Sequence, residues 1–213
     1  MTRILVVKDN EKALGEGKHG KVYACSWQGQ GDDQKRMVVK VPLGTNCPQI
    51  ILIEDYAHTK GFFISTTATN AAPKKRSSIV KGLTLDISIE EKTKTDVEDF
   101  KREWTIAKFL WDNKGGNTRH IAHYIAFGLI DPQTPCLVMQ RYAATLKEIM
   151  MTDENLNWQK VLEHVLLAID YITRVCGVQH HDIRTDNIMT DNIMTDYGDW
   201  YVCDFGEAKI EEG

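Results

Sequence analysis

The chain has 213 residues, of which 42% are hydrophobic and 26% are charged. This composition is typical of a soluble globular protein and excludes the collagen, disordered and coiled-coil classes, and the length suits one large domain or two small lobes. The formal charge of -4 provides no large positive field, so we expect neither nucleic acid nor an anionic membrane to bind the surface as a whole.

The apolar runs are short. Residues 50–53 and 165–169 fall far below the roughly 20 apolar residues of a membrane-spanning helix. The apolar run between Arg3 and Lys8 is too short for the core of a secretory signal. The five cysteines lie far apart without a C-x-x-C pair, which argues against a zinc site and a disulfide framework. We therefore predict a cytoplasmic protein with reduced thiols.

The beginning of the chain has the alternating pattern of β-strands. Residues 4–7, 21–27 and 37–41 alternate in this way, and a turn-rich segment precedes the third run, so we predict a β-meander. From about 42 to 95 the pattern loosens, and we interpret this segment as an insertion that is partly loop. Its apolar runs, 50–53 and 62–64, are candidates for additional strands whose pairing the pattern does not fix.

Helical spacing begins after the insertion. Apolar residues recur at helical intervals from Val97 to Leu110, and Thr95 with Glu98 has the spacing of a capping box. We predict a helix that begins after Thr95 and ends before Gly115.

Two strand-like runs follow, 121–130 and 136–142. A second long helix is predicted over 158–174, because its apolar residues share one face and Gly177 suits a C-terminal cap. Residues 185–189 and 190–194 both read Thr-Asp-Asn-Ile-Met. This repeat is too short for a repeat architecture and indicates a local duplication.

A glycine-rich turn lies between two of the predicted strands. Gly15, Gly17 and Gly20 have the spacing G-x-G-x-x-G, which lets backbone N–H groups approach phosphate oxygens. A dinucleotide-binding fold would open a helix here, but residues 21–27 have strand character. Val22 completes G-x-G-x-x-G-x-V, and Lys40 lies near the end of the third strand.

Two later motifs arrive in the order that completes a known pattern. Residues 180–187 read His-His-Asp-Ile-Arg-Thr-Asp-Asn, and residues 204–206 read Asp-Phe-Gly. With the glycine-rich turn and Lys40, they make the chain resemble the protein-kinase family over 13–41, about 96–151 and 156–209. The resemblance implies an α+β, two-lobed kinase-like fold. A β-rich N-lobe would span 1–140, including the insertion at about 42–95, and an incomplete helical C-lobe would span 141–213.

The resemblance also implies roles for individual residues, with ATP and Mg²⁺ as cofactors. Lys40 would pair the α- and β-phosphates and would itself be held by Glu103. We choose Glu103 over Glu98 because the capping box already uses Glu98. Asp182 would orient the attacking hydroxyl and accept its proton, and Arg184 would approach the γ-phosphate.

The metal ligands implied by the resemblance are Asn187 and Asp204. The implied nucleotide contacts come from the glycine-rich turn, an apolar sandwich, the lysine and a hinge of backbone at 140–142. They are Leu14, Gly15, Gly17, Gly20, Val22, Val38, Lys40, Met139, Gln140, Tyr142 and Met189.

The sequence departs from the family pattern in three places. It stops seven residues after Gly206 without an A-P-E motif, so we expect either a fragment or a natural short form. His181 replaces the arginine of H-R-D, so activation-loop phosphorylation should not be the switch. The duplication offers both Asn187 and Asn192 as metal ligands, and the spacing from Asp182 favours Asn187.

Two functions are compatible with these observations. The first is an ATP- and Mg²⁺-dependent protein kinase that transfers the γ-phosphate to Ser or Thr hydroxyls, with Tyr as the less favoured acceptor. The second is a non-catalytic kinase mimic that binds nucleotide or a kinase partner and regulates it. In both cases we expect a protein partner or substrate. We also expect an apolar face on helix 158–174 that a partner or self-association would cover, or that would lower solubility.

Overall fold

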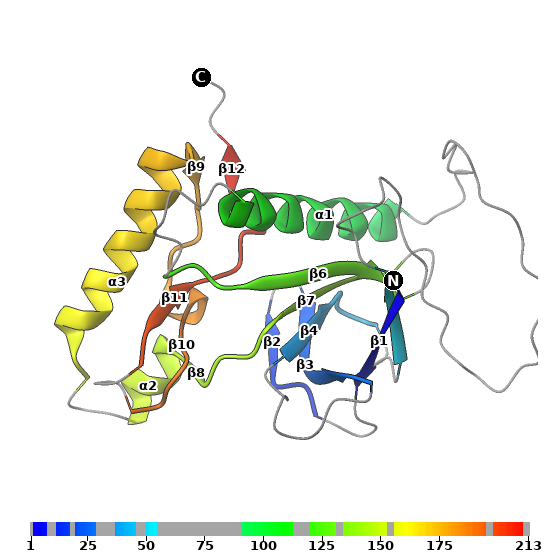
Figure 1. The fold of residues 1–213 in the computed structure, drawn as a ribbon, viewed down its shortest axis with the longest axis horizontal. Helices are drawn as coiled ribbons and strands as arrows, with labels where there is room; N and C mark the ends of the chain where they lie inside the picture. The colour runs from blue at the N-terminus through cyan, green and yellow to red at the C-terminus, as the bar shows by residue number, and fades with distance from the viewer. Residues whose placement is uncertain are drawn as a thin grey trace, which may run out of the picture.

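The computed structural model describes residues 2–7, 12–17, 20–28, 37–45, 50–54, 91–112, 120–130, 134–152, 156–194 and 198–210. These residues form a mixed α+β arrangement. A curled antiparallel sheet carries one long helix, and a group of shorter elements with a second long helix lies at one end (Figure 1).

The large sheet has the strand order β5-β1-β3-β4-β7-β6, and β2 pairs with β3. The bounds are β1 Thr2–Val7, β2 Gly15–Gly17, β3 Gly20–Trp27, β4 Met37–Val41, β5 Ile50–Glu54, β6 Tyr124–Leu129 and β7 Pro135–Gln140. All pairs are antiparallel. Because β5 also lies against β6, the sheet curls back on itself.

The strand predictions for 4–7, 21–27 and 37–41 are confirmed. The runs at 4–7, 21–27 and 37–41 are β1, β3 and β4, which lie side by side as a meander. The run at 50–53 is also a strand, β5, and it pairs with β1. The candidate strand at 62–64 and most of the predicted insertion lie outside the described residues.

The long helix α1 spans Glu91–Asp112 and lies along β6 and β7 (Figure 1). The prediction that it begins after Thr95 was wrong, because Thr95 lies inside the helix. Residues 91–94 include glutamate and lysines but no glycine or proline, so nothing in them stops the helix from extending upstream. Phe100, Trp104 and Leu110 are buried as the helical spacing predicted.

The remaining elements gather at the other end of the molecule. They are β8 Ala144–Thr145, α2 Leu146–Thr152, α3 Trp158–Asp170, a π-helical turn η3 Tyr171–Val175, β9 Val178–Gln179, a 3-10 turn η4 Thr185–Asn187, β10 Ile188–Thr190, β11 Trp200–Val202 and β12 Lys209–Ile210. The predicted helix at 158–174 is α3 together with η3. Gly177 follows with a φ of 62°, the left-handed conformation that suits a C-terminal cap.

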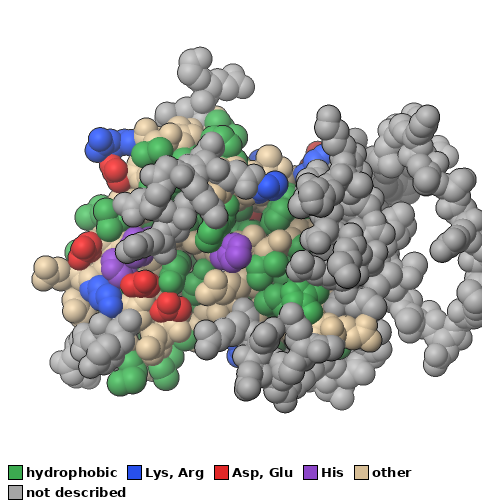
Figure 2. Space-filling model, in the orientation of Figure 1, with side chains coloured by type: hydrophobic (Ala, Val, Ile, Leu, Met, Phe, Trp, Pro, Cys, Tyr) green, Lys and Arg blue, Asp and Glu red, His purple; other side chains and the backbone are tan. Residues whose placement is uncertain are grey.

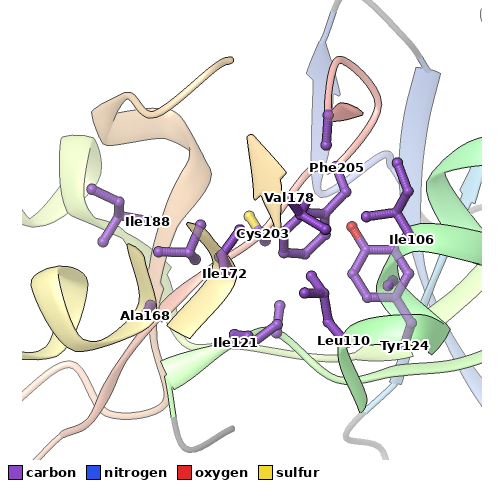
Figure 3. Close-up of a cluster of buried hydrophobic side chains, with 14 of the residues drawn as sticks. Ile106, Leu110, Ile121, Tyr124, Ala168, Ile172, Val178, Ile188, Cys203 and Phe205 are labelled. Atoms are coloured by element: carbon purple, nitrogen blue, oxygen red, sulfur yellow. The ribbon is translucent and has the colours of Figure 1, made fainter. Parts of the chain in front are cut away.

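The buried side chains form two clusters. The smaller one fills the inside of the curled sheet and includes Val39 and Val41 of β4. The larger one joins α1 and β6 to α3, β10 and β11, and Trp200 is one of its fully buried members. Phe205, also fully buried, lies near Tyr124 in this cluster (Figure 3). Since strand side chains alternate, Val38 and Lys40 face away from the smaller cluster. The candidate site lies on the side of the sheet that Val38 and Lys40 face.

Candidate functional site

A cavity of about 930 Å³ lies between the large sheet and the elements of residues 141–207. All of the predicted site residues line it. They are Leu14, Gly15, Gly17, Gly20, Val22, Val38, Lys40, Glu103, Met139, Gln140, Tyr142, Asp182, Arg184, Asn187, Met189 and Asp204. They come from segments far apart in the sequence, and the fold brings them to one cavity.

Lys40 is the charged centre of one wall. Its Nζ lies 2.9 Å from Glu103 Oε2 and 3.0 Å from Asp204 Oδ1. It also lies 5.7 Å from the ring centroid of Phe100, so an aromatic face supports the cation. Lys40 and Glu103 are almost fully buried, whereas Asp204 is partly open to the cavity. The ammonium therefore joins β4, α1 and the segment after β11.

Burial and shared charge set the protonation of this group. Burial opposes the positive charge of Lys40, but Glu103 and Asp204 outweigh it and raise the pKa of Lys40. Burial also raises the pKa of Glu103, and the negative charge of Asp204 adds to this, while the Lys40 ammonium and the Tyr124 hydroxyl act in the opposite direction. Two carboxylates thus share one ammonium.

Tyr124 of β6 completes this group, and the sequence analysis missed it. Its hydroxyl donates to Glu103 Oε1 at 2.8 Å and accepts the backbone N–H of Asp204 at 3.1 Å. The sequence pattern predicted a strand at 121–130 and assigned Tyr124 no role beyond it. The available signal was that a buried tyrosine hydroxyl needs a hydrogen-bond partner.

Asp182 lies on another wall, in the segment between β9 and η4. The side-chain amide of Asn187 donates to its backbone carbonyl at 2.9 Å and to its Oδ2 at 2.8 Å. Arg184 Nε lies 3.7 Å from the same carboxylate and 3.9 Å from Asp186. The carboxylate of Asp182 is partly exposed, so it is accessible from the cavity.

His180 contacts this segment and the segment at Cys203 through its two ring nitrogens. Its Nε2 lies 3.0 Å from the carbonyl oxygen of Cys203, and its Nδ1 accepts the N–H of Asp182 at 3.3 Å. An acceptor Nδ1 requires the neutral ring with its proton on Nε2. Burial lowers the pKa of His180 and favours that neutral form, although the Cys203 carbonyl and the nearby carboxylates act in the opposite direction. His180 therefore holds the backbone at Asp182 and the backbone at Cys203.

The two copies of the duplicated pentapeptide adopt different structures. The first copy forms η4 and leads into β10, which buries Asn187 beside Asp182. In the second copy, Asn192 Oδ1 accepts the N–H of Met194 at 3.0 Å within the connection between β10 and β11. Asn192 is not among the residues that line the cavity. Of the two candidates, the fold places Asn187 in the site.

Two site residues other than glycine have a left-handed backbone. His181 has a φ of 62° and Asp204 a φ of 64°. This conformation costs roughly 1–3 kcal/mol for a residue with a Cβ. Such strain persists only where surrounding contacts hold it in place. At Asp204 these contacts are the Lys40 ion pair and the Tyr124 hydroxyl.

The glycine-rich turn forms the β2–β3 hairpin, with Gly15 opposite Val22 and Gly17 opposite Gly20. A Cβ at Gly20 would collide with the carbonyl oxygen of Val41, and its φ of 155° also favours glycine. Around Gly15 and Gly17 the space is open, so a chemical group in the cavity could approach this backbone closely.

Apolar side chains on β3, β4 and β7 line the part of the cavity beside the hairpin. The register places Val38 opposite Met139, and Met189 of β10 lies across the cavity. Tyr142, just after β7, accepts the N–H of His123 through its hydroxyl at 3.0 Å, and its ring lies 4.9 Å from that of Tyr201. Leu14 is 47% exposed at the rim.

Several further lining residues were not predicted. They are Glu16, Ala122, Tyr124, Ala143, Ala144, Thr145, Lys147, Glu148, Met151, His181, Asp186, Cys203 and Glu207. Those on α2 were missed because the sequence analysis did not predict that helix. Lys147 of α2 pairs with Asp186 at 3.0 Å, so α2 and η4 are joined at the edge of the cavity.

The donor set suits a hard cation that keeps most of its water. Among the described residues no cluster of three or more His, Cys, Asp or Glu side chains could hold a metal ion alone. Asp204 and Asn187 both line the cavity and offer a carboxylate and an amide oxygen. Mg²⁺ is commonly held by one or two such ligands together with waters and phosphate oxygens, so these residues fit it.

No family model matches this sequence, and no curated protein matches it significantly. In the part of the chain that the structure describes, no helix is long and apolar enough to cross a membrane. On the face shown in Figure 2, acidic, basic and histidine side chains are interspersed over the end that holds α3 and the β10–β11 hairpin.

Proposed function

We propose that this protein is an ATP- and Mg²⁺-dependent phosphotransferase of the protein-kinase type that acts on Ser or Thr hydroxyls of proteins. The observation that carries this proposal is that Lys40, Glu103 and Asp204 meet at 2.9–3.0 Å in the same cavity that Asp182 and Asn187 line. Phosphoryl transfer needs a fixed cation, metal ligands and a group that orients the nucleophile, and these residues offer all of them.

The proposal extends to the fold and the location of the protein. The large curled sheet with α1 would be the N-lobe, and the elements after β7 would be the C-lobe of a kinase-like arrangement. The cavity between them would hold the nucleotide. We also propose a cytoplasmic location, where ATP and protein substrates are available.

The nucleotide would bind along the β2–β3 hairpin. Val22, Val38 and Met189 are the apolar groups available to an adenine ring, and the backbone at 140–142 supplies hydrogen-bonding groups beside them. The open backbone at Gly15 and Gly17 would lie over the phosphates. Lys40 would contact the phosphates while Glu103 keeps it in place.

The acceptor hydroxyl would approach Asp182. Its carboxylate is oriented by Asn187 and is partly open to the cavity, so it can accept the proton as the hydroxyl oxygen attacks. Arg184 is close enough to the same carboxylate to place its positive charge near the transferred group. Bound Mg²⁺ would neutralise charge on the phosphates, and Asp204 and Asn187 are the residues that would hold it.

The test begins with nucleotide binding. Calorimetry and thermal shift with ATP and Mg²⁺ should show binding, and transfer of labelled phosphate to a generic protein substrate should follow, with ATP hydrolysis as the second readout. Absence of stabilisation at millimolar nucleotide contradicts the proposal. Binding without either activity, also in the presence of candidate protein partners, would favour a nucleotide-binding kinase mimic instead.

A further inference from the structure

The hydroxyl of Tyr124 connects two groups that both contact Lys40. Glu103 gives one carboxylate oxygen to Lys40 at 2.9 Å and the other to Tyr124 at 2.8 Å. Asp204 gives its carboxylate to Lys40 at 3.0 Å and its backbone N–H to Tyr124 at 3.1 Å. The four residues therefore form a closed ring of hydrogen bonds and ion pairs that spans β4, α1, β6 and the segment after β11.

The surroundings of Tyr124 hold its hydroxyl in this position. The residue is 5% exposed, and its ring lies 6.0 Å from the ring of Phe205, within the larger buried cluster (Figure 3). Burial, together with the negative charge of Glu103, raises the pKa of Tyr124 well above its usual value. The hydroxyl is thus held where it donates its hydrogen bond to Glu103.

Without this hydroxyl the closed ring of hydrogen bonds and ion pairs would lose two contacts at once. Glu103 Oε1 would lose the donor it has in the buried interior, and the carboxylate could rotate away from Lys40. The N–H of Asp204 would lose its acceptor at a residue whose backbone is already strained. Both consequences reach Lys40 and Asp204, whereas neither reaches the apolar part of the cavity at Val22 and Val38.

We propose that Tyr124 is a positioning residue that keeps Glu103 and Asp204 in the arrangement in which both meet Lys40. This inference rests on the proposed function, because the arrangement matters for binding the phosphates and the metal. It goes beyond the kinase resemblance, which assigned nothing to Tyr124. The link also makes α1 and the segment at 204 depend on one another, since one hydroxyl holds both.

The test compares two ligands and two tyrosines. Tyr124→Phe should weaken binding of ATP with Mg²⁺ by about tenfold, because a hydrogen bond to a charged group is lost. Binding of adenosine without metal should stay within about twofold of the parent. Tyr171→Phe is the matched control: Tyr171 is also buried, its hydroxyl donates to the Leu110 carbonyl at 3.0 Å, and it does not line the cavity. This control should leave both ligands unaffected.

A second measurement, hydrogen exchange, begins with the parent chain. In the parent chain the amide of Asp204 should exchange its hydrogen as slowly as the amides of β11, because Tyr124 accepts it. In Tyr124→Phe the exchange at Asp204 should become faster, while Tyr171→Phe should keep it slow. Fast exchange at Asp204 in the parent overturns the inference even if Tyr124→Phe does not fold.

The outcomes separate this inference from the proposed function. If the parent binds no nucleotide, the proposed function fails, and the positioning role fails with it. If the parent binds ATP and Tyr124→Phe binds it equally well, only the inference about Tyr124 fails. An equal loss of ATP and adenosine binding would also overturn it, because that pattern indicates general destabilisation.

Discussion

The side-chain amide of Asn187 donates to both the backbone carbonyl and the carboxylate of Asp182, at 2.9 and 2.8 Å. One residue thus fixes both the path of the chain at 182 and the direction of the carboxylate. Asn187 in turn accepts the N–H of Cys203 through its own carbonyl at 3.0 Å, next to Asp204. The candidate proton acceptor and one candidate metal ligand are therefore linked through a single asparagine.

Asp182→Asn should abolish phosphate transfer and spare nucleotide binding. The carboxylate is assigned to the acceptor hydroxyl, so its loss should lower the transfer rate by about 10²–10⁴-fold. The dissociation constant for ATP with Mg²⁺ should stay close to that of the parent. Asp170→Asn is a suitable control, because Asp170 is an exposed carboxylate that pairs with Arg174 away from the cavity. A variant that still transfers phosphate at the parent rate would show that Asp182 is misassigned.

Asp204→Asn should act on an earlier step. Its carboxylate is one of the groups that would hold Mg²⁺, so we expect weaker binding of ATP in the presence of Mg²⁺ as well as lost turnover. Adenosine binding without metal should be much less affected. Calorimetry with and without Mg²⁺ distinguishes the two ligands. Equal affinity of parent and variant for ATP with Mg²⁺ would remove Asp204 from the metal site.

Lys40→Met should destabilise the fold as well as weaken phosphate binding. It leaves the buried Glu103 carboxylate without its cation, a change that typically costs about 3–5 kcal/mol of unfolding free energy. Lys40→Met combined with Glu103→Gln should be less destabilised than Lys40→Met alone, because the unpaired charge is gone. Urea denaturation measures both. Lys147→Met, which removes an exposed ion pair, should cost less than about 1 kcal/mol. Equal stability of the single and double variants would contradict the prediction.

Acid should weaken the contact between α3 and β11 through His164. Its Nδ1 accepts the N–H of Trp200 at 3.2 Å, and its ring stacks on His120 at 3.9 Å. Burial, the neighbouring His120 and Lys160 lower the pKa of His164, while Asp199 and Glu163 oppose them. A folded-state pKa below 6.5 means that the unfolded chain takes up the proton first, so stability should fall as pH drops below 6.5.

His164→Gln provides the comparison for this pH effect. The glutamine carbonyl can accept the Trp200 N–H but does not titrate. Thermal melts between pH 5 and 8 should therefore show a steeper acid loss for the parent than for the variant. Parallel curves would show that His164 does not carry the effect.

The outer face of α3 should tolerate charge. Trp158, Leu162 and Leu166 are 47%, 55% and 61% exposed, whereas Val161 and Val165 of the same helix are buried. Replacing Leu162 by Lys and Leu166 by Glu should change the unfolding free energy by less than about 1 kcal/mol in total and reduce self-association in light scattering. Leu110→Ala, in the buried cluster, should cost about 2–5 kcal/mol. A large loss of stability in the double variant would indicate that this face is covered.

The sequence predicted elements best where side-chain periodicity was strong. The alternation in β3 and the helical spacing from Phe100 to Leu110 come from burial on one face. Both patterns can therefore be recognised in the sequence alone. The start of α1 was missed because a Thr-x-x-Glu pattern also occurs inside helices. α2 was missed because its short run, Leu146–Thr152, has only two buried residues, Leu146 and Ile149.

For the site, the motifs predicted which charged residues meet in one cavity. They did not predict the contacts that hold these residues there. Tyr124 is 21 residues from Glu103 and 80 from Asp204, so only the packing of β6 against α1 and the segment after β11 brings them together. The choice of Glu103 over Glu98 agrees with the geometry, although the capping argument behind it was wrong. Glu98 is exposed, and Glu103 lies on the buried face of α1.

The duplicated pentapeptide has a consequence for the length of the β10–β11 hairpin. Deleting residues 185–189 or residues 190–194 gives the same shorter polypeptide. In it, the remaining Thr-Asp-Asn-Ile-Met copy is followed directly by Thr195 and Asp196. A Thr-Asp pair would again follow Ile-Met, as Thr190 and Asp191 do now. Asp191 presently accepts the N–H of Asp199 at 2.8 Å and the Tyr201 hydroxyl at 3.0 Å. In the shorter chain Asp196 would take that place, with only Tyr-Gly left to turn the hairpin, a length that suits a two-residue loop. We therefore expect gain or loss of the five residues to change the length of the connection between β10 and β11, while Asn187 keeps its place beside Asp182.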